Sequence, residues 1–187
     1  MTRWKPDAAG RLIKAAIMLF DRQGYEETTV TEIAESAGLT KRTFFRHFAD
    51  KREVLFQGSE ELERVWVDGV ASAPPDASAL EAVMAGLGPV TAMFTERHPF
   101  AQIRTRIVAA NPELQERELI KLQTLAAAIA AALRARGVPD DAAVLAAQTG
   151  VTVFHVAFAR WVAQDDPDAF QRLTQESLEQ LRSVTAT

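Results

Sequence analysis

Cationic and polar side chains gather within a few positions of one another in the first quarter of the sequence. Lys41, Arg42 and Thr43 are consecutive, and Arg46 and His47 follow about one helical turn later. Charged and hydrogen-bonding side chains that lead a helix can reach base edges and phosphates in DNA, provided that the helix enters the major groove. Whether these side chains can reach DNA depends on the helices that carry them.

Two short helices that meet at Gly38 would present these side chains in the required way. Thr29 and Glu32 have the spacing of a capping box, which predicts a helix that begins at Thr29. Gly38 ends this helix, because it can take a turn conformation that a Cβ would disfavour. Thr40 can cap a second helix that runs through Phe48. This arrangement predicts a helix-turn-helix.

Apolar spacing predicts further helices and no strand along the rest of the chain. Leu12, Ala16 and Phe20 share one face of a helix that ends at Gly24. Pro89 lies inside another predicted helix, where it is expected to cause a kink or a break. The remaining helices are expected at about 50–71, 79–97, 100–110, 112–137, 140–164 and 167–183.

These elements predict an all-α protein of about nine helices in two domains. Residues 1–52 would form a three-helix domain that contains the helix-turn-helix, and residues 53–187 would form a helical bundle. The whole chain has a net charge of −4, but its first 52 residues hold ten Lys and Arg against seven Asp and Glu. The N-terminal domain is therefore the electropositive part of an acidic protein.

Composition and hydropathy argue against several classes of protein. The chain has no cysteine, so disulfides and thiolate metal sites are excluded. We expect a cytoplasmic protein, because no signal peptide is visible in the polar N-terminal residues. The apolar stretch 142–163 contains Gln148, His155 and Arg160. These polar side chains favour a helix buried in a soluble protein over a membrane span.

The run from Thr28 to Lys51, TTVTEIAESAGLTKRTFFRHFADK, resembles the N-terminal signature of the TetR family of transcription regulators. The resemblance implies that Arg42 reads guanine, since a guanidinium fork matches the O6 and N7 acceptors of that base. The family usually has tyrosine where this chain has Phe45, so the phosphate hydrogen bond of a hydroxyl is lost there. The implied DNA contacts are Lys41, Arg42 and Thr43 in the groove, Thr29, Thr40, His47 and Lys51 on phosphates, and Phe45 and Arg46 beside them.

Structural roles stay open for several of these residues. Arg46 also suits a solvated surface charge, His47 a capping or packing residue, and Lys51 an exposed position in a first helical turn. Arg3 and Lys5 could form an arm that reaches the DNA backbone or the minor groove.

The resemblance also implies a homodimer that forms through the last two helices. A two-fold axis would place two recognition helices one DNA turn apart, about 34–36 Å, which matches a palindromic operator in double-stranded DNA. We expect a repressor, because a dimer on its operator blocks polymerase without any further surface. The expected interface residues are Trp161, Phe170, Leu173, Leu178 and Leu181.

A cavity for a small apolar or amphipathic effector is expected among the helices of the second domain. The TFFRHF run and residues 104–122 resemble regulators of the mycofactocin system, which indicates an acyl-CoA-like or fatty effector. Methionine and phenylalanine are also ordinary core residues, so both roles stay open. The expected lining residues are Trp66, Met84, Leu87, Phe94, Ile103 and Phe158, with Arg104, Gln148, Thr152 and His155 as polar anchors.

An enzyme and a helix-turn-helix that contacts only protein are the two alternatives. The only histidines, His47, His98 and His155, are far apart in the sequence, and no metal-ligand, phosphate-loop or nucleophile spacing is present. We therefore expect no catalytic residue, no metal and no cofactor. Lys41 and Arg42 at the groove-facing end of the second helix argue against a role in protein contact alone.

Overall fold

The chain is all-helical. The computed structural model describes residues 7–185, and within them it contains nine α-helices, three 3-10 helices and no strand. This confirms the predicted fold class. Arg3 and Lys5, the expected N-terminal arm, lie outside the described residues.

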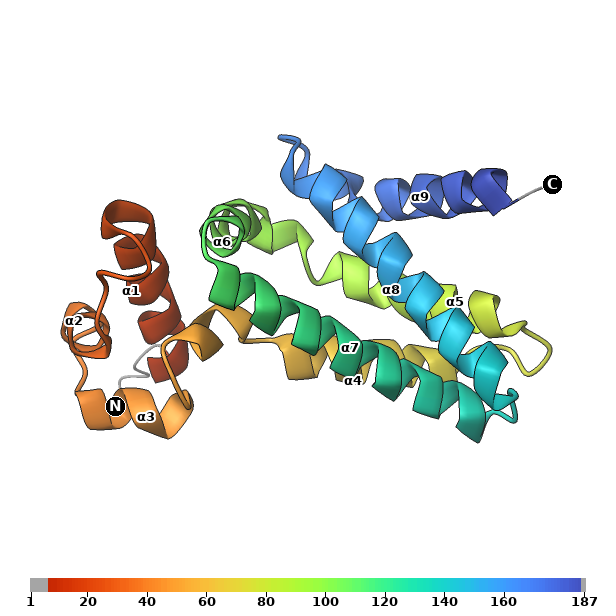
Figure 1. The fold of residues 1–187 in the computed structure, drawn as a ribbon, viewed down its shortest axis with the longest axis horizontal. Helices are drawn as coiled ribbons and strands as arrows, with labels where there is room; N and C mark the ends of the chain where they lie inside the picture. The colour runs from red at the N-terminus through yellow and green to blue at the C-terminus, as the bar shows by residue number, and fades with distance from the viewer. Residues whose placement is uncertain (1–6, 186–187) are drawn as a thin grey trace, which may run out of the picture. The chain divides into compact units, whose positions relative to one another are not determined.

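The helices divide into two compact units, drawn in Figure 1. The first unit comprises the chain up to Gln57 together with Ile103–Arg117. The second unit comprises Gly58–Gln102 together with the chain from Glu118 onward. The predicted division into residues 1–52 and 53–187 differs from these units at residues 53–57 and at Ile103–Arg117.

The first unit begins with the three expected helices, α1 (Ala8–Gln23), α2 (Val30–Ser36) and α3 (Lys41–His47). The apolar face of α1 is buried, as its spacing predicts. The helix ends at Gly24, whose φ of 91° is a conformation that residues with a side chain rarely adopt.

The turn between α2 and α3 depends on glycine. Gly38 has a φ of 64°, and the following amide of Leu39 donates to the carbonyl of Ala34 at 2.8 Å. The guanidinium of Arg11 donates to the carbonyl of Ala37 and packs against the turn. A Cβ on Gly38 would lie 2.8 Å from Nη2 of Arg11, so both backbone conformation and space favour glycine here.

The helix predicted for residues 50–71 is divided in two. The carboxylate of Asp50 caps a short 3-10 helix, Arg52–Phe56, whose apolar residues are buried in the first unit. Gly58 follows with a φ of 93°, and α4 (Ser59–Ala71) begins after it. A residue in the left-handed region cannot continue a right-handed helix, so the prediction of one continuous helix was wrong.

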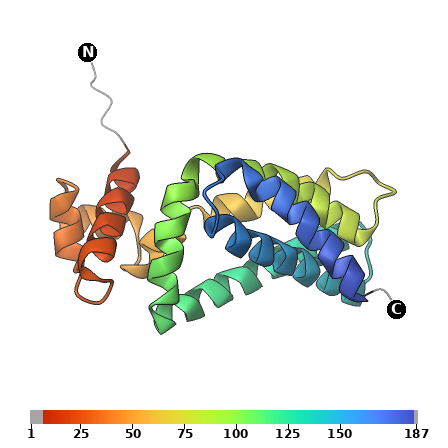
Figure 2. The same ribbon diagram turned by 90° about the horizontal axis from the view of Figure 1, so that it is seen from above.

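The second unit is a bundle of α4, α5 (Ala79–Ala92), α8 (Asp140–Val162), α9 (Phe170–Thr185) and most of α7 (Pro112–Ala135). Helix α5 packs against both α4 and α8, and α8 packs against α9. Figures 1 and 2 both show α9 beside α8. The core of the unit lies between these helices and includes apolar residues of α7.

Glycines let the helices of this bundle approach one another closely. A Cβ on Gly69 of α4 would lie 2.5 Å from the Cα of Gly86 in α5, and a Cβ on Gly86 would lie 2.6 Å from the carbonyl oxygen of Trp66. A Cβ on Gly150 of α8 would collide with the side chain of Val83. Trp66 is fully buried at this crossing, and its Nε1 donates to the carbonyl of Val83 at 2.8 Å.

Helix α5 continues through Pro89 as a single helix, so a break at this proline is absent. Proline removes only one amide donor, and packing on both α4 and α8 holds the backbone in place. The helix ends at Ala92, short of the predicted end at residue 97. A 3-10 turn, Thr95–Arg97, then leads directly into α6 (His98–Ala109).

Among residues 7–185, α8 is the one helix long and apolar enough to cross a membrane. One of its faces, which includes Val151, Phe154 and Trp161, is buried in the second unit. Its other side leaves Leu145 and Val156 exposed, so α8 is buried on one face rather than on several sides. A 3-10 turn, Pro167–Ala169, connects α8 to α9.

Candidate nucleic-acid interface

Helix α3 presents its cationic side chains to solvent. Phe44 is fully buried in the first unit and fixes the rotation of the helix, so Lys41, Arg42 and Arg46 are exposed on its other face. Within residues 7–185 neither arginine pairs with a carboxylate. Both guanidinium groups therefore keep their donors for a ligand.

The N-terminus of α3 is held by a side-chain cap, as the sequence predicts. The amide of Thr43 donates to Oγ1 of Thr40 at 3.2 Å, and the two threonine hydroxyls lie 3.0 Å apart. The cap begins the helix at Lys41, so the cationic residues occupy its first turn. In a helix-turn-helix, this is the turn that meets base edges.

The predicted capping box at the start of α2 is present. The backbone amide of Thr29 donates to Glu32 Oε2 at 2.8 Å, and the amide of Glu32 donates to Thr29 Oγ1 at 3.2 Å. The backbone hydrogen bond from Thr29 is the main reason why the pKa of Glu32 is lowered. The Thr29 hydroxyl also donates to Glu32 Oε2, at 2.7 Å, so in this structure its proton is directed at Glu32.

Lys51 has a structural contact that sequence reasoning missed. Its Nζ donates to the carbonyl of Tyr25 at 2.7 Å and lies 4.1 Å from the centre of the Tyr25 ring. Burial and a hydrogen bond with Glu113 raise the pKa of the Tyr25 hydroxyl. Lys51 therefore fastens the loop between α1 and α2 to the segment that follows α3. His47, by contrast, is exposed on the last turn of α3.

The end of α6 and the start of α7 add three arginine contacts to the first unit. Arg104 Nε donates to the carbonyl of Leu55 at 2.7 Å, and its guanidinium lies 4.9 Å from the Phe56 ring. Arg106 pairs with Asp21 at 3.0 Å, and Arg117 pairs with Glu53 at 2.6 Å.

Arg104, expected to anchor a ligand, is thus placed against the 3-10 helix of the first unit. These contacts join residues about 50 to 85 positions apart, so no local pattern signals them.

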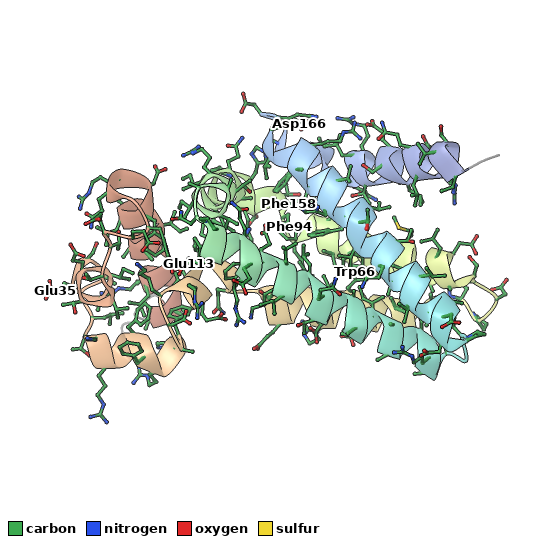
Figure 3. All side chains as sticks on the ribbon, viewed as in Figure 1. Glu35, Trp66, Phe94, Glu113, Phe158 and Asp166 are labelled. Carbon is green, nitrogen blue, oxygen red and sulfur yellow. The ribbon has the colours of Figure 1, made fainter. Side chains whose placement is uncertain are left out.

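The aromatic residues expected to line a cavity pack against one another in the second unit. Figure 3 labels Trp66, Phe94 and Phe158. Phe94 makes an edge contact with Phe158 at 5.7 Å between ring centres, and Trp66 lies 5.6 Å from Phe154. Trp66 is fully buried, as is Leu87, and Met84 packs at the edge of the same core. The structure thus brings these apolar candidates together.

The structure separates the polar anchors from this aromatic cluster. Gln148, Thr152 and His155 are exposed along one face of α8, whereas the face that carries Phe154 is buried. Gln148 Nε2 donates to Gln123 of α7 at 3.1 Å. Ile103 and Arg104 belong to the first unit.

His98 is a buried polar residue in this region that the sequence did not single out. Its Nε2 lies 3.1 Å from the carbonyl oxygen of Trp161, and the two rings are in edge contact. The contact ties the start of α6 to the end of α8. A histidine directly before proline at a helix start gives no signal of such a partner.

The predicted dimer residues fall into two groups. Trp161, Phe170 and Leu173 are fully buried within the second unit of a single chain. Leu178 and Leu181 on α9 are half-buried. The large apolar side chains that α8 leaves exposed are different ones, Val144, Leu145 and Val156.

Comparison with known proteins agrees with this geometry. Residues 12–57 match the family described as bacterial regulatory proteins, tetR family. The HTH-type transcriptional regulator TcmR of Streptomyces glaucescens is 41% identical over 83 residues, which are 44% of this chain and 32% of that protein. MftR of Mycobacterium tuberculosis, named for mycofactocin biosynthesis regulation, is 31% identical over 103 residues, 54% of this chain and 50% of that protein. The matched segments span half or less of both relatives.

A solved structure matches over nearly the whole length. The transcriptional regulator FadR from Bacillus subtilis, in complex with stearoyl-CoA, has a TM-score of 0.62 and 20% identity, and the match covers 95% of this chain and 99% of that chain. At that identity the likeness shows a shared fold.

The fold and the exposed α3 helix together define a helix-turn-helix domain. Residues 12–57 carry the N-terminal domain that this family of bacterial regulatory proteins shares. The matched relatives are transcriptional regulators, and MftR is a distant, partial homologue of this chain.

Proposed function

We propose that the chain represses transcription by binding a palindromic operator as a homodimer, and that a small apolar or amphipathic effector releases it. The main support for the proposal is the exposed cationic surface of α3. Lys41, Arg42 and Arg46 are exposed there without a carboxylate partner in the described residues, on a helix capped at its start and anchored by buried Phe44. Such a surface suits phosphates and guanine in a major groove.

The proposed dimer forms through α8 and α9. Leu145 and Val156 support it, because they are large apolar side chains left exposed on α8. Thr152 lies between them on the same exposed face. Pairing this face with that of a second chain would remove apolar surface from water. A two-fold axis would then present two α3 helices to the two halves of a palindrome.

The proposed effector is acyl-CoA-like or fatty. The shared fold with FadR, which binds stearoyl-CoA, supports this class of ligand. The aromatic cluster around Phe94, Phe154 and Phe158 offers the apolar surface that an acyl chain needs. Thermal-shift titration with stearoyl-CoA and with free fatty acids tests this part. A rise in melting temperature is expected, and no shift with any of them would remove this effector class.

Release requires that the effector bind the DNA-free protein more tightly than the DNA-bound protein. A dimer on its operator blocks polymerase by occupying the site. At saturation, an effector lowers the affinity for the operator by the ratio of its own affinities for the DNA-free and the DNA-bound protein. An effector that leaves operator affinity unchanged would contradict this role.

Selection of binding sites from random double-stranded DNA with the purified chain tests the proposal. An enriched palindrome is expected for the wild-type protein. The double variant Lys41→Ala, Arg42→Ala should enrich nothing, although both side chains are exposed and the fold is expected to stay intact. If no sequence is enriched by the wild-type protein at low salt, the proposal is wrong.

A further inference from the structure

Phe45 is an aromatic side chain on the DNA-facing surface of α3. Half of its surface is exposed, whereas Phe44 and Phe48 of the same segment are buried in the first unit. Phe44 and Phe48 therefore fill the core at this helix, and Phe45 does not. The Phe45 ring is therefore available to a partner outside the fold.

The ring lies in the middle of the cationic surface. Lys41 Nζ lies 6.0 Å from its centre, and an edge contact with Phe44, at 5.5 Å between ring centres, sets its orientation. A hollow on this surface is lined by Arg42, Thr43, Phe45 and Arg46.

The chemistry of the major groove offers one apolar partner for such a ring. Base pairs present hydrogen-bond donors and acceptors there, and thymine adds its 5-methyl group. The Phe45 side chain has no donor or acceptor and cannot hydrogen-bond a phosphate or a polar base edge. Contact with a methyl group removes apolar surface from water on both sides.

We infer that Phe45 contacts the 5-methyl group of a thymine in each half of the operator. The inference rests on the proposed DNA-binding function, and it names thymine as the base that Phe45 selects. Phe45 follows Arg42 by three residues, or about 4.5 Å along a helix that rises about 1.5 Å per residue. Base pairs repeat every 3.4 Å or so. The thymine is thus expected within about two base pairs of a guanine read by Arg42.

Deoxyuridine substitution tests the inference, because it removes the 5-methyl group and keeps the base pair. The probe is the duplex enriched by selection from random DNA, synthesised with each thymine replaced in turn by deoxyuridine. Replacement at one position in each half-site should weaken wild-type binding about fourfold, the effect expected for one apolar carbon. Replacement elsewhere should have no effect.

Variants of Phe45 assign that effect to this side chain. Phe45→Ala should bind the thymine duplex more weakly and should not distinguish thymine from deoxyuridine at the sensitive position. Phe45→Leu retains apolar surface and should still distinguish them. Circular dichroism and the melting temperature should be unchanged in both variants, because the ring is half exposed and the core lies beneath Phe44.

Each outcome is decisive. If no thymine position responds, or if Phe45→Ala responds as strongly as the wild type, the inference is wrong while DNA binding by the chain stands. If the wild-type protein enriches no sequence at all, the proposed function fails and the inference fails with it.

Discussion

At the scale of single residues, Lys51 illustrates how a position on a proposed DNA surface can also hold the fold together. Its ammonium group donates to the carbonyl of Tyr25 and lies over that ring. A charged hydrogen bond and a cation–π contact reinforce each other in this geometry. The loop that leads into α2 is therefore secured by a residue beyond α3.

Replacing Lys51 by methionine is expected to destabilise the first unit by about 1–3 kcal/mol, because the Tyr25 carbonyl loses a charged donor. The measurement is thermal unfolding followed by circular dichroism. Lys14→Met is the matched control, since Lys14 is exposed on α1. Equal melting temperatures for the two variants would show that the Lys51 contact contributes nothing.

The residues of α3 could be predicted from the sequence, whereas the partner of Lys51 could not. The cationic residues and their cap lie within one short run, so spacing alone places them on one helix. Lys51 and Tyr25 are 26 positions apart, and only the packing of α1 against the segment after α3 brings them together. The same reason explains why Arg104, expected near a ligand, is found on Leu55.

At the scale of elements, the capping box of α2 predicts a pH dependence. The pKa of Glu32 is lowered in the folded chain, first by the hydrogen bond from the Thr29 amide and then by its hydroxyl. A carboxyl whose folded pKa is depressed stabilises the fold above its unfolded pKa, about 4.3. That stabilisation is lost as the pH falls from there through the folded pKa.

Glu32→Ala should therefore lower the melting temperature at neutral pH, and its difference from the wild type should shrink as the pH falls below about 4. Melting curves over a pH series measure this. Glu35→Ala is the control on the same helix, because Glu35 is exposed and is not part of the box. A difference that persists at low pH would contradict the account.

The close approach of α4 and α5 at Gly69 and Gly86 leads to a second prediction at the scale of elements. Gly86→Ala should destabilise the second unit by about 1–3 kcal/mol, because the new Cβ would lie 2.6 Å from the Trp66 carbonyl oxygen and force the helices apart. Gly10→Ala in α1 is the control, with its nearest atom at 3.8 Å. It should instead stabilise the chain by about 0.5–1 kcal/mol. Melting temperatures of the two variants would move in opposite directions.

Elements whose signals are local were predicted well, and those that depend on packing were not. The caps at Thr29 and Thr40 gave the starts of α2 and α3. Gly58 lies inside the helix that the sequence predicts for residues 50–71. Its φ of 93° interrupts the helical backbone, so a 3-10 helix ends before it and α4 begins after it. The sequence gives no sign of the close approach of α4, which requires a glycine at position 86.

At the scale of the whole molecule, the proposed dimer would connect the second unit to DNA recognition. Leu145→Glu places a charge on the exposed face of α8, where the leucine is 68% exposed in the single chain. The variant should fold normally but shift from dimer to monomer, and operator affinity should fall with it. Light scattering after size exclusion measures the mass. Leu119→Glu on α7, 63% exposed, is the matched control and should remain dimeric.

The division into units was predictable in outline only. A polar, cationic first quarter and an apolar helical remainder suggested a boundary near residue 52. The segment Ile103–Arg117 packs with the first unit through Arg104, Arg106 and Arg117. Such long-range hydrogen bonds and ion pairs carry no periodic signal in the sequence. Trp161, Phe170 and Leu173, which were expected at a dimer interface, are buried within the single chain, where the rings of Trp161 and Phe170 stack on each other.

The most direct test of the central claim is an equilibrium titration of the chain with its selected palindrome and with a scrambled duplex at about 50 mM and about 200 mM salt. Because cationic residues neutralise phosphates and release counterions, binding should weaken steeply between the two salt concentrations. The palindrome should be preferred at both, with two chains bound per duplex. Equal affinity for both duplexes, or binding that does not change with salt, would contradict the account.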